Sequence, residues 1–249
     1  MAGHSHWAGI KHKKGANDAA RGKIFQKLFK EIYVAGTANG ALPDPELNPA
    51  LKLAISKAKS KNMPKANIER ALAKAKGEGK DGVSYTETLF NGTISGGGTF
   101  LVKTLSDNMK RTTSQMTMYF NRQNGSLGKT GQVPFQFDHK GVLEIAKNAI
   151  DEEQLTMIAL DNGAEDIQNL EGSYLITTLP ENFSLCKSAI EDVLGVTEFL
   201  QCEVTYLPNT TVSYDAEKLE KISEFLNTLE DDDDVQEVFH NIEFPEDDE

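Results

Sequence analysis

The sequence has little cysteine and no long apolar run. Only Cys186 and Cys202 occur among 249 residues, too few for a disulfide framework and too far apart for a Cys-x-x-Cys redox or zinc motif. We therefore expect both to be core residues of a cytoplasmic protein. No apolar run approaches the roughly 20 residues that a membrane-spanning helix needs, and the start lacks the apolar region of a secretory signal. A membrane location is not expected.

The sequence also lacks a recognisable catalytic or metal-binding constellation. Past residue 12 the only histidines are His139 and His240, and neither lies in a nucleophile or base motif. The early histidines His4, His6 and His12 have no cysteine or carboxylate nearby to complete a tetrahedral zinc set. The sequence therefore predicts no catalytic residue, no metal site and no cofactor.

Two further segments resemble ligand sites only superficially. Gly128-Lys129-Thr130 imitates the end of a phosphate-binding P-loop, but Gln123 stands where the first glycine belongs, and the strand-like stretch 133–137 follows where a helix is required. The four aspartates 231–234 lack the spacing and glycine of an EF-hand, so we expect them to repel one another and stay solvated.

What the chain does have is a strongly basic first third. Residues 1–80 contain sixteen lysines and arginines against six acidic residues, a net charge of +10, whereas the whole chain carries −12 and the remainder therefore −22. Phosphate neutralisation needs local positive charge, so this asymmetry predicts a polyanion partner for the amino-terminal end.

The basic third is predicted to form three amphipathic helices. Ile24, Leu28 and Ile32 recur at helical spacing. Asn48 followed by proline favours a second helix that begins at residue 49 and ends near residue 61, and a third helix should follow Pro64 and end before the glycines at 77 and 79. Such helices make a small helical domain with lysines on its outside.

Beyond residue 82 the periodicity alternates between strands and helices. A β-β-α pattern is predicted twice, from Tyr85 to Arg122 and from Val133 to Asn162. The fold class that follows is α+β. The strands are predicted at 85–90, 99–105, 133–137, 141–145, 174–178, 203–207 and 235–239, and the helices at 112–122, 152–162, 181–194 and 216–229.

Several stretches of the chain resemble the YebC/PmpR family, which includes the mitochondrial translational activator of cytochrome oxidase subunit one. The resemblance implies a multidomain α+β protein in which a helical amino-terminal domain precedes two α+β domains, the third inserted in the second. The expected domains are 1–80, 81–132 plus 208–241, and 133–207, with an acidic tail at 242–249. The matching stretches are Met1–Lys14, Arg21–Phe25, Asn62–Arg70, Ser106–Thr112, Asn124–Gly128 and Leu229–Gln236.

One loop departs from the family pattern. Where the family commonly has an aromatic-Glu-Gly-Tyr-Gly-Pro-Gly-Gly sequence, this chain reads Phe90-Asn-Gly-Thr-Ile-Ser-Gly-Gly97. The acid, the tyrosine and the proline are absent, while the glycines keep the backbone freedom of a tight turn. We therefore expect the amino-terminal domain, rather than this loop, to carry the functional surface.

The candidate nucleic-acid contacts are basic residues that would bind phosphates, with Trp7 offering a stacking face. A solvated basic face without a ligand is the alternative. By resemblance the chain is expected to be a non-enzymatic DNA-binding transcriptional regulator, with a ribosome-associated translation factor that binds ribosomal or transfer RNA as the second hypothesis; an enzyme is the third. The candidates are Trp7, Lys11, His12, Lys13, Lys14, Arg21, Lys23, Lys27, Lys30, Lys57, Lys59, Lys61, Lys65, Lys110 and Arg111.

Overall fold

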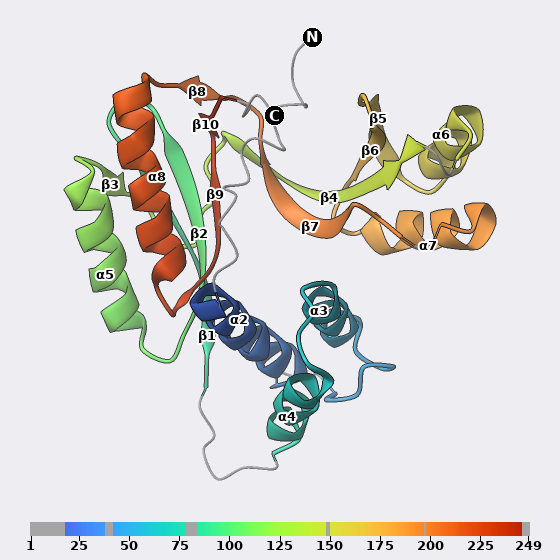
Figure 1. Ribbon diagram of the computed structural model, residues 1–249, viewed down its shortest axis with the longest axis horizontal. Coiled ribbons are helices and arrows are strands. Elements are labelled where there is room, and N and C mark those ends of the chain that lie inside the picture. The colour runs from blue at the N-terminus through green and yellow to red at the C-terminus, as the bar shows by residue number, and fades with distance from the viewer. Residues whose placement is uncertain (1–17, 38–41, 78–83, 148–149, 197, 246–249) are drawn as a thin grey trace. The chain divides into compact units, whose positions relative to one another are not determined.

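The computed structural model describes residues 18–37, 42–77, 84–147, 150–196 and 198–245. The chain divides into two compact units, and Figure 1 labels their helices and strands. The first unit comprises residues 12–132 with 215–238, and the second comprises 133–214 with 239–249. The finer division into a helical domain, a sheet domain and an insert stays a prediction.

Three helices at the start of the first unit enclose an apolar core, as the sequence predicts. Asn48 caps the second of them, because its side-chain oxygen accepts a hydrogen bond from the Leu51 N–H at 3.0 Å, with Pro49 at the first helical position. The core is formed by one face of each helix, including Ile32, Leu51 and Ile68. These helices are α2 (Asp18–Thr37), α3 (Pro49–Ser60) and α4 (Lys65–Ala75).

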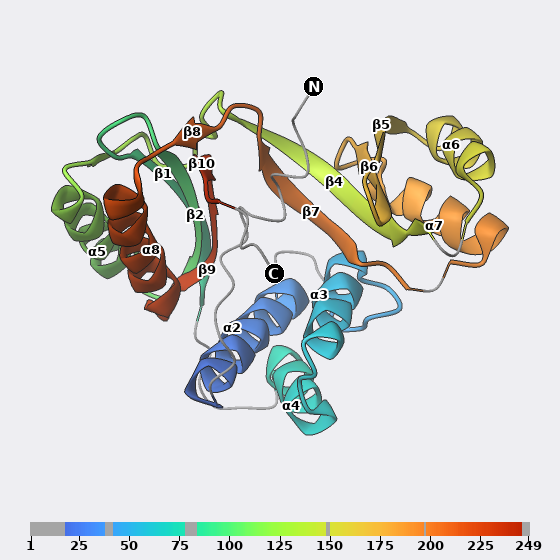
Figure 2. The ribbon, with the colours of Figure 1, turned by 45° about the horizontal axis from the view of Figure 1, so that its top comes forward.

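A four-stranded sheet with two helices on one face completes the first unit (Figure 2). Its strand order is β3-β1-β2-β9, and the predicted glycine turn joins β1 to β2 with positive φ at Gly96 and Gly97. The elements are β1 (Thr86–Thr93), β2 (Thr99–Ser106), α5 (Met109–Arg122), β3 (Ser126–Leu127), α8 (Ala216–Asp231) and β9 (Val235–His240).

Three phenylalanines hold this sheet to its helices. Phe100 on β2, Phe120 on α5 and Phe225 on α8 are buried and meet edge to face, with ring centroids 5.2 to 6.0 Å apart. Edge-to-face contact aligns the positive rim of one ring with the negative face of the next. The trio is therefore the centre of this core.

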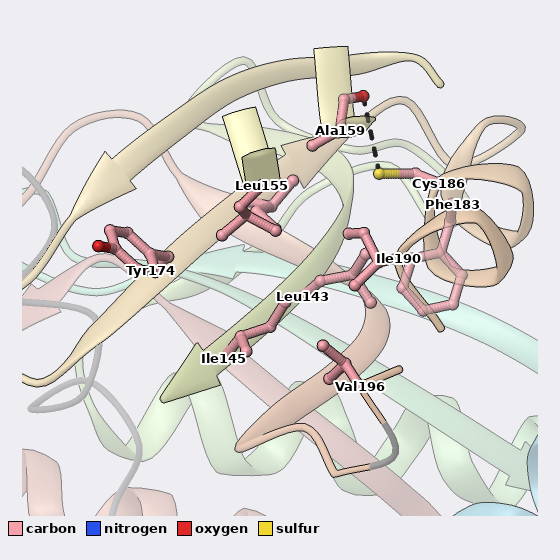
Figure 3. Packing of buried hydrophobic residues seen from close by; sticks show 10 residues of the cluster. Leu143, Ile145, Leu155, Ala159, Tyr174, Phe183, Cys186, Ile190 and Val196 are labelled. Carbon is pink, nitrogen blue, oxygen red and sulfur yellow. Dashed lines mark hydrogen bonds between the residues drawn. The ribbon is translucent and has the colours of Figure 1, made fainter. Parts of the chain in front are cut away.

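The second unit has its own four-stranded sheet, in the order β5-β6-β4-β7. One face packs against two helices through a buried cluster that includes Leu143, Leu155, Phe183 and Ile190 (Figure 3). A short parallel pair joins β8 to β10. The elements are β4 (Phe137–Ala146), α6 (Glu152–Asp161), β5 (Ala164–Asn169), β6 (Ser173–Thr178), α7 (Phe183–Leu194), β7 (Gln201–Pro208), β8 (Val212–Ser213) and β10 (Ile242–Glu243).

Two expectations for the second unit are wrong. Residues 133–136 form no strand, and a single strand runs unbroken from Phe137 to Ala146, so the second β-β-α repeat is a β-α pair. Pro134 has no N–H to give to a ladder, which explains why the strand begins after it. The sequence also missed β5, an edge strand whose residues Ala164–Asn169 contain mostly polar side chains.

The phenylalanine trio predicts a large stability cost for Phe120→Ala. The ring is fully buried, so its removal should lower the free energy of unfolding by about 3–5 kcal/mol. Urea unfolding followed by circular dichroism measures the change. Met118→Ala on the same helix, where the side chain is 41% exposed, is the matched control, and equal losses in the two variants would contradict the assignment.

Candidate nucleic-acid interface

The predicted phosphate-binding residues fall into three groups. Trp7, Lys11, His12, Lys13 and Lys14 lie outside the described residues, so their assignment stays a prediction. A second group is engaged with acidic segments of the first unit, and a third is exposed at the surface. The second group contains Lys23, Lys27, Lys30, Lys57 and Arg111, and the third contains Arg21, Lys59, Lys61, Lys65 and Lys110.

Three lysines of α2 bind the end of α8. Lys23, Lys27 and Lys30 are spaced by four and three residues and share one helix face. Their Nζ atoms donate to main-chain carbonyls of the turn 230–233 at 3.2, 2.7 and 2.7 Å respectively. The last carbonyls of a helix lack helical partners and lie at the negative end of its dipole. This lysine–carbonyl junction thus fixes α2 to α8.

Asp234 lies beside the junction and is 4% exposed. Its carboxylate accepts hydrogen bonds from Arg111 at 2.7 Å, Thr112 at 2.9 Å and Ser106 at 3.1 Å, and Lys30 Nζ lies 3.6 Å away. Burial alone would raise the pKa of Asp234. The hydrogen bonds and the Lys30 charge outweigh it, so the pKa lies below its ordinary 3.8. The carboxylate is therefore ionised and fully partnered.

The expectation that all four aspartates 231–234 stay solvated is therefore wrong. Asp232 accepts a hydrogen bond from the Tyr119 hydroxyl at 3.0 Å, and Asp234 is buried. Cations and hydroxyls from α2, β2 and α5 replace the lost hydration, which is the condition under which a buried carboxylate is tolerated.

Lys57 on α3 is committed to a second internal ion pair. Its Nζ lies 3.1 Å from Glu31 and also contacts Glu237 of β9. Burial acts to lower the pKa of Lys57, but the charges of Glu237 and Glu31 outweigh it and raise the pKa above its usual range. Lys57 is therefore charged, but two carboxylates already neutralise it.

Sequence reasoning missed two further cations, Arg70 and Lys74, on α4. They are one turn apart on α4, and each lies over an aromatic ring of α2: the Arg70 guanidinium is 5.4 Å from the Phe29 centroid, and Lys74 Nζ is 5.6 Å from that of Tyr33. The spacing of four residues between Arg70 and Lys74 is the feature of the sequence that could have indicated two cations on one helix face. Both line a cavity of about 740 Å³ bordered by α2, α4, Tyr85 and the 230–233 turn.

Other candidate chemistry finds no support among the described residues. They contain no group of three or more histidine, cysteine, aspartate or glutamate side chains that could hold a metal ion. Burial raises the pKa of Cys186 and Cys202 to about 11, so both thiols are protonated at neutral pH. In the part of the chain described, no helix has the length and apolar content to span a bilayer.

The Asp234 cluster predicts a pH-dependent stability contribution. Asp234→Asn should lower the free energy of unfolding by roughly 2 kcal/mol at pH 7, because bonds to a charged acceptor are lost. A lowered native pKa means that this contribution is fully present above the unfolded pKa, near 4, and is lost as pH falls through the lower native value.

Urea unfolding between pH 2 and pH 7 measures this dependence. The difference from wild type should be constant above pH 5 and shrink below pH 4. Asp233→Asn makes the same charge change at an exposed side chain and should leave stability nearly unchanged. A pH-independent difference for Asp234→Asn would contradict the assigned ionisation.

Comparison with known proteins confirms the resemblance and the α+β multidomain fold class. A family model described as the TACO1/YebC protein N-terminal domain matches residues 5–78, and one described as the TACO1/YebC second and third domain matches residues 85–242. A probable transcriptional regulatory protein of Mycoplasmopsis agalactiae is 69% identical, over 99% of this chain and 100% of its own.

More distant relatives span nearly the full length as well. A probable transcriptional regulatory protein of Thermotoga maritima is 45% identical over 98% of this chain and 94% of its own. The crystal structure of a conserved hypothetical protein from Aquifex aeolicus is 42% identical, with a TM-score of 0.78 over 98% of both chains. On these matches the chain belongs to the TACO1/YebC family.

Proposed function

We propose that this protein is a non-enzymatic, cytoplasmic regulator of gene expression that binds nucleic acid through its basic amino-terminal helices. The observation that carries the proposal is the net charge of +10 in residues 1–80 of an acidic chain. Within that region Lys59 and Lys61 are exposed and are not among the lysines that we assign to internal ion pairs. The printed names of the relatives, probable transcriptional regulatory proteins, agree with this role.

The proposed phosphate contacts are those that the interior of the first unit does not use. Lys57 and Arg111 are paired with carboxylates, so we assign them to structure. Lys59, Lys61, Lys65 and Lys110 are exposed and make the more direct candidates, together with the basic start of the chain. Contacts of this kind set affinity and position without reading sequence.

DNA is the first target proposed, and RNA of the ribosome or of transfer RNA is the second. The second is favoured by Trp7 in the basic start of the chain, because an aromatic ring can stack on an unpaired base of RNA. Crosslinking in cells, followed by sequencing of both DNA and RNA, separates the two. Discrete promoter sites support transcription, whereas dominant ribosomal or transfer RNA supports translation.

Replacing Lys59, Lys61 and Lys65 together by glutamine should weaken binding to duplex and single strand alike. Each lost phosphate contact should reduce the slope of log affinity against log salt by roughly 0.7 to 0.9. Filter binding at several salt concentrations measures both effects. Glutamine at Lys140, Lys147 and Lys187 in the second unit is the control with the same charge change, and an equal loss there would sink the assignment.

Trp7, the only tryptophan, provides a separate test of base stacking. Trp7→Ala should cost roughly 1–3 kcal/mol of binding to single-stranded RNA if the indole stacks on a base. Thermal unfolding should be unchanged. Intrinsic fluorescence of the wild type should be quenched by RNA, and blue-shifted emission that ignores RNA would show a buried indole instead.

A further inference from the structure

The cavity between α2 and α4 combines aromatic rings with cations. Phe25 and Phe29 of α2 and Tyr85 line it, as do Arg70 and Lys74 of α4. Phe25 and Phe29 are only half-buried against the helical core, so part of each ring borders the cavity. Rings of this kind offer a flat apolar surface that any nucleobase can stack on.

Two of these rings already carry a cation on one side. The Arg70 guanidinium lies 5.4 Å from the Phe29 centroid, and Lys30 Nζ lies 5.4 Å from that of Tyr85. A guanidinium held over a ring is itself a planar surface on which an unstacked base can lie. The cavity therefore presents ordered planar groups beside fixed positive charge.

The charge of the lining matches an anion. Three lysines of the lysine–carbonyl junction border the cavity together with Arg70, Lys74 and the acidic residue Asp233. Lys23 and Lys30 also pair with Asp231 and Asp234, so Arg70 and Lys74 are the cations that we assign to an anion. The carbonyl bonds hold the three lysine side chains in one direction. Arg70 and Lys74 reach the cavity from the opposite helix and can flank a phosphate from that side.

The volume of the cavity suits a single nucleotide rather than a longer segment of nucleic acid. At about 740 Å³, the cavity falls within the roughly 300–1,000 Å³ range of small-molecule sites. A base inside a duplex is stacked and paired, so its face is not accessible to such a cavity, whereas an unpaired base can be splayed out into it.

The surroundings favour a strand over a free nucleotide. Met63 lines the cavity and stands between the exposed lysines Lys61 and Lys65. Both lysines are two residues from Met63 in the sequence, which makes them candidates for the phosphates on either side of a held nucleotide. A free nucleotide would use neither.

We propose that the α2–α4 cavity holds one unpaired nucleotide of a nucleic-acid single strand, with its base on the Phe25, Phe29 and Arg70 surface and its phosphate beside Lys74. The proposal rests on the proposed function, because it names the site and the strand form within it. It adds a requirement that phosphate contacts alone do not impose, namely at least one unpaired base.

The test compares two variants of the full chain on two labelled ligands, a 12-nucleotide uridine strand and a 12-base-pair duplex, by fluorescence anisotropy. Phe25→Leu with Arg70→Gln should lower affinity for the strand about tenfold and change affinity for the duplex less than twofold. The matched control, Lys59→Gln, removes the same single positive charge outside the cavity lining and should lower both affinities alike. A cavity variant that weakens both ligands equally, or neither, overturns the proposal.

Arg70→Gln alone keeps the test valid if the double variant is destabilised, because the Arg70 side chain is exposed. A strand that contains 4-thiouridine should crosslink on irradiation to the peptide of α2 that contains Phe25 and Phe29 or to the one that contains Tyr85. Crosslinks confined to other peptides overturn the assignment.

Uridine 5′-monophosphate, used as a competitor, tests whether the cavity binds a nucleotide of a single strand or a free nucleotide. It should displace the strand only at concentrations far above the dissociation constant of the strand. Displacement at equal concentration overturns the strand assignment. Wild-type chain that binds neither labelled ligand at low salt refutes the proposed function itself, whereas intact binding by the cavity variants refutes only the cavity proposal.

Discussion

The attraction between the lysines of α2 and the carboxyl-terminal end of α8 is the constraint on which the first unit depends. Three ammonium groups donate to carbonyls at the last turn of the helix and just beyond it, at 2.7 to 3.2 Å, where helical partners are lacking. Asp234 adds a buried carboxylate that joins β2, α5 and α2. An isolated surface ion pair contributes little to stability, but a partly buried network shares the ordering cost of its side chains.

Because of this network, the positive charge of residues 1–80 has a structural role as well as a proposed binding role. The net charge of residues 1–80 suggests a surface devoted to an external polyanion, yet part of that charge neutralises Asp231, Asp234 and Glu237 of the same chain. The acidic remainder thus has a structural partner of its own. The cations left at the surface, and those around the α2–α4 cavity, form a smaller and better defined set.

The sequence predicts the local structure well and the long-range pairing poorly. The beginning of α3 follows from Asn48 and Pro49, because a cap is a contact between near neighbours. By contrast, Lys27 and Glu230 are 203 residues apart, and periodicity cannot show that they meet. The edge strand β5 was missed for a related reason: its polar side chains carry no apolar alternation, and only its pairing with β6 defines it.

Because the lysines of α2 and their carbonyl partners are far apart in the sequence, they are synthesised at different times. The helices α2 to α4 are complete at Ala75, whereas the carbonyls that their lysines bind belong to residues near 230. At about 5–20 residues per second, the ribosome needs roughly 8–30 s to make the intervening segment. During that interval the newly made lysines of α2 emerge beside ribosomal RNA, itself a polyanion, before their partners in the chain have been translated.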